Sequence, residues 1–221
     1  MKSVLQVLVS RKSYDPSAVT AREAIAHLLG FDDRLRDLQR RELHEIVLEH
    51  PGWPPEEARL RFGVYLQQTF IFWNPNKHRA WIRESREPDA CLEALARGTR
   101  PAAEFGAPDC ARPEYDHVLL WPRDGVAVPP DLAEALRPGR IEAYARGELY
   151  SLLWGRAGGS SDEGATAAER REWSESVAVG RGPHRGLLVN PHAQEHERLA
   201  GPVLLPQWFR AMGERSQAAR V

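Results

Sequence analysis

The chain has 221 residues, which is enough for one large domain or two small ones. Its 30 Lys and Arg residues balance 31 Asp and Glu residues, and this balance argues against a general binder of polyanions. Two cysteines, Cys91 and Cys110, are too few for a disulfide framework or a Cys-based zinc site. No apolar run approaches membrane-spanning length, so we expect a cytoplasmic protein with reduced thiols.

The first half of the chain predicts alternating strands and helices. Residues 4–10 are apolar and predict a strand. Asp15 followed by Pro16 is typical of a helix start, and Gly30 is typical of a helix end. The elements expected after Gly30 are strands at residues 35–38 and 43–49, joined by a hairpin near Arg40 and Arg41, then a helix between residues 54 and 74 and a strand at residues 78–83. This order, β-α-β-β-α-β, is the ferredoxin-like plan.

The second half predicts the same order in a looser form. Its expected elements are a strand at residues 117–121, a short helix through residue 136, a hairpin of residues 141–145 and 149–154, a helix at residues 167–176 and a final strand before residue 200. We therefore expect an α+β fold of two tandem ferredoxin-like modules, at residues 1–85 and 114–200. Residues 86–113, punctuated by prolines, are the expected linker, and residues 201–221 are a C-terminal tail.

An internal repeat supports this division. Residues 40–48 align with residues 146–154, and Arg, Glu and Leu coincide at one offset. Residues 7–9 align with 118–120, and residues 72–75 with 188–191, in the same order along the chain. A repeat of this length indicates that one structural unit is present twice.

One segment resembles a catalytic motif. His192, Glu195 and His196 fit the H-x-x-E-H pattern of inverted zinc peptidases, in which both histidines bind the metal from one face of a helix. That site requires a third ligand downstream, where few residues remain, and the repeat favours a strand here. A zinc-dependent hydrolase with His192 and His196 as metal ligands is therefore an alternative hypothesis. No other acid–base pair converges, and we expect no cofactor.

The two Asn-Pro turns are the candidate binding surfaces. Large aromatic side chains dominate interface energetics, which favours partner contacts at the turns and at an aromatic pair in the tail. The expected interface residues are Phe72, Trp73, Asn74, Pro75, Asn190, Pro191, Trp208 and Phe209. Burial of the tryptophans within their own modules is the competing interpretation. A further alternative is a small-ligand or nucleotide site formed by Asn74, Lys77, His78 and Arg79, because this turn is polar and basic.

The first module resembles PurS, the small subunit of bacterial formylglycinamidine ribonucleotide amidotransferase. The run that carries the resemblance comprises Val7-Leu8-Val9, Asp15-Pro16, Leu28-Leu29-Gly30-Phe31, the segments Leu35-Arg36-Asp37-Leu38 and Glu42-Leu43-His44-Glu45-Ile46, and Asn74-Pro75. It covers residues 1 to about 84 and, more weakly, residues 115–200. Order and spacing carry the resemblance, and no single motif in it is diagnostic.

The resemblance implies a non-catalytic subunit of ferredoxin-like fold. Such subunits pair their sheets and bridge a glutaminase and an ATP-using synthetase subunit in purine biosynthesis, helping ammonia pass between them. A tandem copy would form a covalent pseudo-dimer and could also associate into homo-oligomers. This chain departs from the family in its length, in the insertions of its second copy and in its tail.

Overall fold

The computed structural model describes residues 2–54, 57–69, 72–74, 76–84, 90–91, 115–124, 126–155, 165–179, 187–190 and 192–200. These residues form a mixed α+β fold with a seven-stranded sheet of order β4-β3-β1-β2-β6-β5-β7, and every neighbouring pair of strands is antiparallel. The strands are β1 (Lys2–Arg11), β2 (Leu35–Glu49), β3 (His78–Glu84), β4 (Ala90–Cys91), β5 (Tyr115–Pro122), β6 (Arg140–Trp154) and β7 (Gln194–Ala200). The helices are α1 (Pro16–Leu29), α2 (Glu57–Thr69), α4 (Pro130–Ala135) and α5 (Ala167–Ala178).

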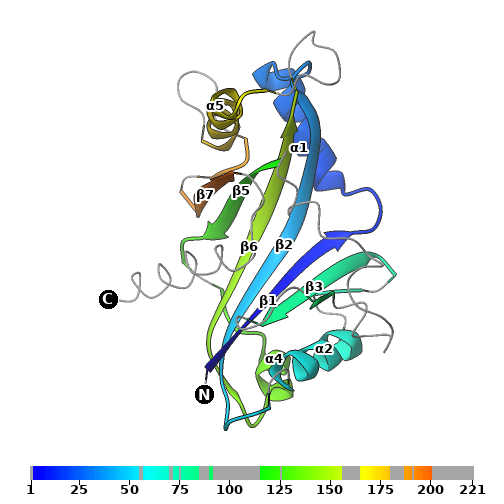
Figure 1. The fold of residues 1–221 in the computed structure, drawn as a ribbon, viewed down its shortest axis with the longest axis vertical. Helices are drawn as coiled ribbons and strands as arrows, with labels where there is room; N and C mark the ends of the chain where they lie inside the picture. Colours follow the sequence, from blue (N-terminus) through cyan, green and yellow to red (C-terminus); the bar gives the residue numbers. More distant parts are fainter. Residues whose placement is uncertain are drawn as a thin grey trace.

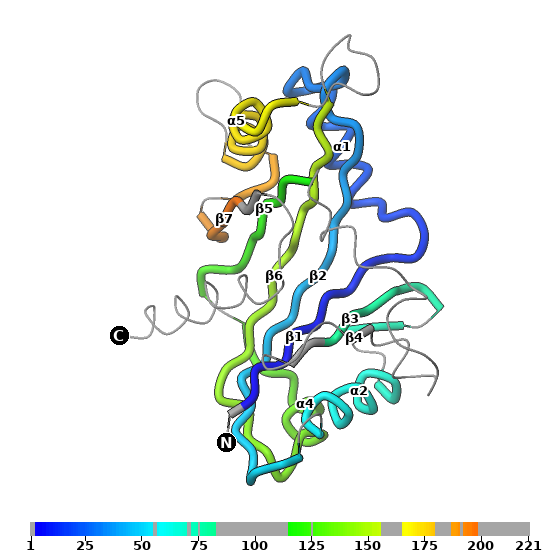
Figure 2. Tube along the Cα trace, in the orientation of Figure 1, coloured from blue at the N-terminus to red at the C-terminus, as the bar shows by residue number. Residues whose placement is uncertain are grey.

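The two longest strands, β2 and β6, run side by side along the length of the molecule (Figure 1). Strands β1 and β3 lie on one side of this central pair, and β5 and β7 lie on the other (Figure 2). Helices α2 and α4 lie together at one end of the molecule, and α1 and α5 lie at the other. None of the helices in the described part of the chain is long and apolar enough to span a membrane.

Helix α1 begins and ends where its sequence predicts. The Asp15 side chain accepts a hydrogen bond from the Ser17 N–H, and Pro16 occupies the first turn, where its missing N–H costs nothing. Gly30 ends the helix in the left-handed conformation, with φ of 71°, which a residue with a Cβ atom adopts at a cost. The expected strands at both ends of each half are also confirmed, as β1, β3, β5 and β7.

The two predicted hairpins are wrong. Residues 35–49 form one continuous strand, β2, and residues 140–154 form another, β6. Arg40 and Arg41, the expected turn, instead pair with Tyr150 and Leu149 of β6. Neither position carries a Gly, Asn, Asp or Pro residue that would favour a turn, so the strand continues and finds its hydrogen bonds in the other half. Each half therefore has the order β-α-β-α-β, and the predicted plan of β-α-β-β-α-β is not found.

The strand pairings repeat about a pseudo-two-fold axis. Leu5 pairs with Ile46 in the β1–β2 ladder, and Asp116 pairs with Leu152 in the β5–β6 ladder. The alignment of Val7 with Val118 makes Leu5 equivalent to Asp116. The alignment of Arg40 with Arg146 makes Ile46 equivalent to Leu152, so the two pairs are equivalent. The offset that aligns Asn74 with Asn190 likewise relates the β1–β3 and β5–β7 ladders. Glu42 and Glu148, which are equivalent in the repeat, pair directly with each other, so the axis passes between them.

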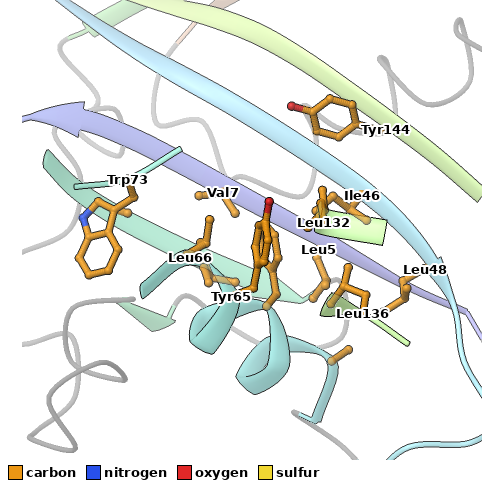
Figure 3. Close-up of a cluster of buried hydrophobic side chains, with 14 of the residues drawn as sticks. Leu5, Val7, Ile46, Leu48, Tyr65, Leu66, Trp73, Leu132, Leu136 and Tyr144 are labelled. Atoms are coloured by element: carbon orange, nitrogen blue, oxygen red, sulfur yellow. The ribbon is translucent and has the colours of Figure 1, made fainter. Parts of the chain in front are cut away.

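Each hydrophobic core combines both halves of the chain. The first core packs β1, the second half of β2 and α2 against Leu132 and Leu136, which belong to α4 and its end (Figure 3). The second core packs β5, the second half of β6 and α5 against Ala18 and Ile25 of α1. The first helix of each half therefore packs against strands of the other half, and α1 also packs against Leu35 and Leu38 of β2. The paired positions of β2 between residues 38 and 46 run without a bulge, so both cores lie on the same face of the sheet.

The second face of the sheet is buried as well. Leu8, Leu43, Leu119 and Leu149 point to this face and are at most 1% exposed. None of the helices described above belongs to this face. Several polar side chains lie among these leucines, and they form part of the candidate site.

Candidate functional site on the central strands

Four charged side chains surround the pseudo-two-fold axis on the helix-covered face. Arg40 donates to Glu148, with Nη2 2.6 Å from Oε1 and Nε 3.2 Å from Oε2. The equivalent pair is Arg146 and Glu42, with Nη2 3.1 Å from Oε2. Asp15 adds a second carboxylate 3.6 Å from Arg40. The repeat therefore places two equivalent ion pairs across the axis. In one the arginine belongs to β2, and in the other it belongs to β6.

The Arg40–Glu148 ion pair keeps its charges. Burial lowers the pKa of Arg40, but the hydrogen bond and charge of Glu148 outweigh this effect and raise it above its ordinary value. Burial raises the pKa of Glu148, whereas the hydrogen bond from Arg40 lowers it, and the net shift is downward. A fork of two parallel hydrogen bonds is the geometry in which Arg binds a carboxylate most strongly. The cluster therefore joins β2 to β6.

His44 lies beside this cluster and is held neutral. Its Nδ1 is 3.0 Å from the Tyr144 hydroxyl, and its ring lies 4.1 Å from the ring of Phe72. Burial first and the charge of Arg146 second lower the pKa of His44 to about 3. A general base works best when its pKa is close to the working pH, so His44 is a poor base near neutrality.

Ser3 and His50 form a buried pair whose hydrogen bond runs in the opposite direction to that of a catalytic Ser–His pair. The Ser3 Oγ is 3.1 Å from His50 Nε2, and the Trp53 N–H donates to His50 Nδ1 at 3.0 Å. Because Nδ1 accepts a hydrogen bond, the neutral ring carries its proton on Nε2 and donates it to Ser3. A serine nucleophile needs the opposite arrangement, in which the histidine accepts the hydroxyl proton.

A second polar cluster lies on the opposite face of the sheet. Arg41 donates to the Ser151 hydroxyl at 2.8 Å and also to the Gln39 side chain. The Ser151 hydroxyl is 2.9 Å from His117 Nδ1. Tyr115 extends the cluster through a bond to Asp37. Arg41, His117 and Ser151 are at most 3% exposed, so this is a hydrogen-bonded polar core.

The two Asn-Pro segments form the same turn. The Asn74 side chain accepts from the Asn76 N–H at 2.9 Å, and its own N–H donates to His78 at 3.1 Å. In the second half, Asn190 accepts from the His192 N–H at 3.1 Å, and its N–H donates to Gln194 at 2.9 Å. Pro75, Pro191, Trp208 and Phe209 lie outside the described residues. The turns are equivalent, as the repeat predicts, and their role as an interface remains a prediction.

Trp73 lies in the first core rather than on the surface of the chain. Its side chain is 2% exposed, and its indole N–H donates to the His78 carbonyl at 3.0 Å. Phe72 is partly buried against the same core. The burial of Trp73 corresponds to the competing interpretation of this residue, because a side chain this enclosed has little surface to offer a partner (Figure 3).

The H-x-x-E-H segment does not form a helix. His192 lies in the exposed turn, and His196 lies in β7. The assumption that both histidines share a helical face is therefore wrong. Among the residues that the structure describes, no three His, Cys, Asp or Glu side chains gather closely enough to hold a metal ion.

The basic turn lies where β3 begins beside the end of β1. Lys77 and Arg79 are exposed, and His78 is partly buried. Burial, followed by the charge of Arg11, lowers the pKa of His78. The turn therefore has exposed cationic side chains, and the ligand site proposed there remains a prediction.

Sequence reasoning missed the charged cluster at the axis and the polar core on the opposite face. The repeat alignment contained Arg40, Glu42, Arg146 and Glu148, but the predicted hairpins separated the strands that bring them together. The absence of any Gly, Pro, Asn or Asp residue between positions 38 and 48 was the signal that favours one long strand.

The chain was compared with models of known protein families, with curated proteins and with solved structures, and nothing matches in any of the three comparisons.

Proposed function

We propose that the chain is a non-catalytic assembly subunit of the PurS-like type, which bridges glutaminase and synthetase subunits of a purine-pathway amidotransferase. The observation that carries this proposal is the continuous sheet that the two halves build about a pseudo-two-fold axis. A tandem copy of a subunit that pairs sheets would form a covalent pseudo-dimer of this kind. The cytoplasmic location follows from the same proposal.

We further propose that each half of the sheet is a ferredoxin-like module made by exchange. The strands β3, β1, the second half of β2 and the first half of β6 are neighbours in that order. Helices α2 and α4 cover them. A ferredoxin-like module has four antiparallel strands and two helices, and here the first helix and second strand would come from the other half of the chain. Exchange of this kind is a low-cost route to dimers.

The polar side chains on the helix-covered face of the sheet support binding rather than catalysis. The four charged groups at the axis neutralise one another, His44 is held neutral with a pKa of about 3, and His50 donates to Ser3. Each of these groups contributes to the connection between strands. A scaffold requires such connections, whereas acid–base chemistry requires groups that change protonation near the working pH.

Exposed apolar residues on α2 indicate where a partner would dock. Leu60 and Val64 are one helical turn apart and are 45% and 50% exposed. The outer side of α5, at the opposite end of the molecule, carries the charged residues Arg171 and Glu172 instead. The pseudo-two-fold symmetry therefore does not extend to these helix surfaces. Of the two, the α2 surface is the apolar one and the better candidate for a docking surface.

A pull-down from the native cell tests this proposal. Tagged wild-type protein should recover glutaminase and synthetase subunits. The double variant Leu60→Glu/Val64→Glu should lose the subunit that docks on α2 while keeping its melting temperature, because both side chains already face solvent. The matched control, Arg171→Glu on α5, should recover both subunits. Recovery of neither subunit by the wild-type protein would overturn the proposal.

A further inference from the structure

A buried band crosses the helix-free face of the sheet. It begins at Trp81 of β3, which pairs with Leu8 and is 8% exposed. It continues through Leu8, Leu43, Leu149 and Leu119 on β1, β2, β6 and β5. Residues that flank the band on the same face are partly exposed, namely Val4, Ser10, Gln39, Val47 and Ala145. Burial on this face is therefore concentrated in a band that runs across the strands.

The strands alone do not account for the burial of Leu43. Leu43 lies directly opposite Gly147, which has no side chain, yet Leu43 is 0% exposed and Gly147 is buried as well. One face of an antiparallel sheet can be open to water, and a leucine on an open face keeps part of its surface exposed. The helices in the described part of the chain pack on the opposite face. The band therefore requires a cover from outside these strands and helices.

The two ends of the band coincide with the two ends of residues 92–114. Trp81 pairs with Cys91 of β4, which precedes this segment, and Tyr115 of β5 follows it. Strand β4 is at one edge of the sheet, so the segment must pass β3, β1, β2 and β6 to reach β5. This crossing is about 24 Å, at about 4.8 Å per strand. The segment can extend over roughly 75 Å, so its length permits the crossing.

The exposure of the central side chains indicates which face the segment crosses. On the helix-covered face, the side chains of Arg40 and Glu148 are 15% and 31% exposed. Arg41, the next residue of β2, points to the other face and is 3% exposed. A segment that crossed the helix-covered face between the two groups of helices would lie over Arg40 and Glu148 and bury them. The helix-free face is therefore the route that fits.

The C-terminal tail fits the band less well. Residues 201–221 follow β7, which is at the other edge of the sheet. Glu195 and Glu197 of β7 pair with Trp121 and Leu119, so they point to the helix-free face, and both are partly exposed. A segment that left β7 to lie on this face would cover these carboxylates first. The band instead ends at β5, where residues 92–114 end.

We propose that residues 92–114 cross the helix-free face as a strap and bury its leucines. Along β2 the band extends from Arg41 to Glu45, which is about 14 Å. One chain segment covers such a width, since a helix with its side chains is about 10–12 Å across. The prolines of the segment have no N–H, so fewer donors need partners above a sheet whose ladders are already paired. Its apolar residues for this contact are Leu92, Leu95 and Phe105.

The strap removes the helix-free face from the surfaces that a partner can use. A second copy of the chain, or another subunit, would have to displace residues 92–114 to reach the leucines. Association should therefore use the helices and the edges of the sheet. This inference does not depend on the proposed function, because a chain with any other role would carry the same strap.

Thiol labelling in a background of Cys91→Ser and Cys110→Ser tests the proposal. Ser151→Cys places a probe in the band, and Ser174→Cys places a matched control under α5, since both serines are 0% exposed. Replacement of residues 94–112 by a Gly-Ser segment of equal length should speed the labelling of Ser151→Cys at least about tenfold. Ser174→Cys should stay protected in the same variant. Deletion of residues 202–221 should leave both probes protected.

Cross-linking provides a second measurement on a chain whose strap is intact. A photoreactive group on Cys110, in a Cys91→Ser background, should cross-link to peptides of β1, β2 and β6. This measurement decides the question if the Gly-Ser variant does not fold, which labelling of Ser174→Cys would reveal. Cross-links confined to the four helices would overturn the proposal.

Three labelling results would also overturn the proposal. One is continued protection of Ser151→Cys in a folded Gly-Ser variant. Another is exposure of Ser151→Cys on deletion of the tail, which would make the tail the cover. The third is protection of Ser151→Cys in the intact chain only at high protein concentration, which would make a second copy the cover.

Discussion

At the residue scale, the adjacent residues His44 and Glu45 point to opposite faces of β2, and burial holds both of them neutral. Burial lowers the pKa of His44 to about 3 and raises the pKa of Glu45 to about 8. Each shift links folding to the uptake or release of a proton. The two residues therefore predict opposite dependences of stability on pH.

Glu45 should destabilise the protein as the pH rises. Unfolded Glu45 loses its proton near its ordinary pKa of 4.5, whereas the folded protein keeps the proton up to about pH 8. The folded state binds more protons between these values, so the free energy of unfolding falls as the pH rises from 4.5 to 8. Glu45→Gln should remove this fall and stabilise the protein at pH 8 by about 1–4 kcal/mol. Urea denaturation at pH 5 and pH 8 measures it, and an unchanged pH dependence would contradict it.

His44 should destabilise the protein as the pH falls. Unfolded His44 gains a proton below about 6.5, whereas the folded protein resists protonation down to about pH 3. The unfolded state binds more protons in this window, so the free energy of unfolding decreases as the pH falls through it. His44→Phe should reduce this acid sensitivity, at a cost of about 1 kcal/mol at pH 7 for the lost contact to Tyr144. Urea denaturation of both proteins at pH 4 and pH 7 provides the comparison.

Trp73→Ala tests whether this residue belongs to the core or to an interface. Because the side chain is 2% exposed, the substitution should create a cavity and cost about 3–5 kcal/mol of stability. The measurement is the melting temperature together with the oligomer size from light scattering. A near-normal melting temperature with a smaller oligomer would instead place Trp73 at an interface.

At the scale of the elements, the pairing of β2 with β6 depends on ion pairs that are equivalent in sequence but differ in burial. The Arg40 side chain is 15% exposed, contacts Glu148 twice and also lies near Asp15. The Arg146 side chain is 48% exposed and bonds to Glu42. Arg40→Ala should cost about 1–3 kcal/mol, because it leaves partly buried carboxylates without their partner. Arg146→Ala should cost less than about 1 kcal/mol, as exposed pairs do.

Chemical denaturation of the two arginine variants gives this comparison directly. The repeat makes each variant the control for the other, since both remove an arginine from the same position of a long strand. Equal losses, or a larger loss for Arg146→Ala, would show that burial does not govern these pairs.

Local chemistry predicted the elements better than their connections. Asp15, Pro16 and Gly30 determine the ends of α1 through the backbone groups that they satisfy, so the sequence predicted them correctly. The hairpin at Arg40 was expected because two apolar runs flank a charged pair. A continuous strand was formed instead, since the paired residues between 35 and 41 find partners in β6, each more than one hundred positions away. Such distant pairing leaves no local pattern.

The candidate site was predictable only in part. The repeat placed Arg40, Glu42, Arg146 and Glu148 at equivalent positions, but their contacts require the pairing of β2 with β6. Glu45 was recognisable as a charged residue between apolar neighbours of a strand. Its position opposite Ala145 of β6, diagonal to Gly147, depends on this register.

At the scale of the whole molecule, exchange of helices joins the two halves into one unit. Helix α1 packs in the core that contains β5 and α5, and α4 packs in the core that contains β1 and α2. Each first helix therefore packs against strands of both halves. The two halves should therefore unfold together in one cooperative transition, because separating them would expose both cores.

The distance between spin labels on helix surfaces tests this exchange most directly. In a background of Cys91→Ser and Cys110→Ser, one label at Leu28 of α1 is paired either with a label at Glu172 of α5 or with one at Leu60 of α2. The exchanged arrangement, with α1 and α5 at one end of the molecule, predicts that the Leu28–Glu172 distance is the shorter (Figure 2). A shorter Leu28–Leu60 distance would place α1 beside α2 and contradict the exchange.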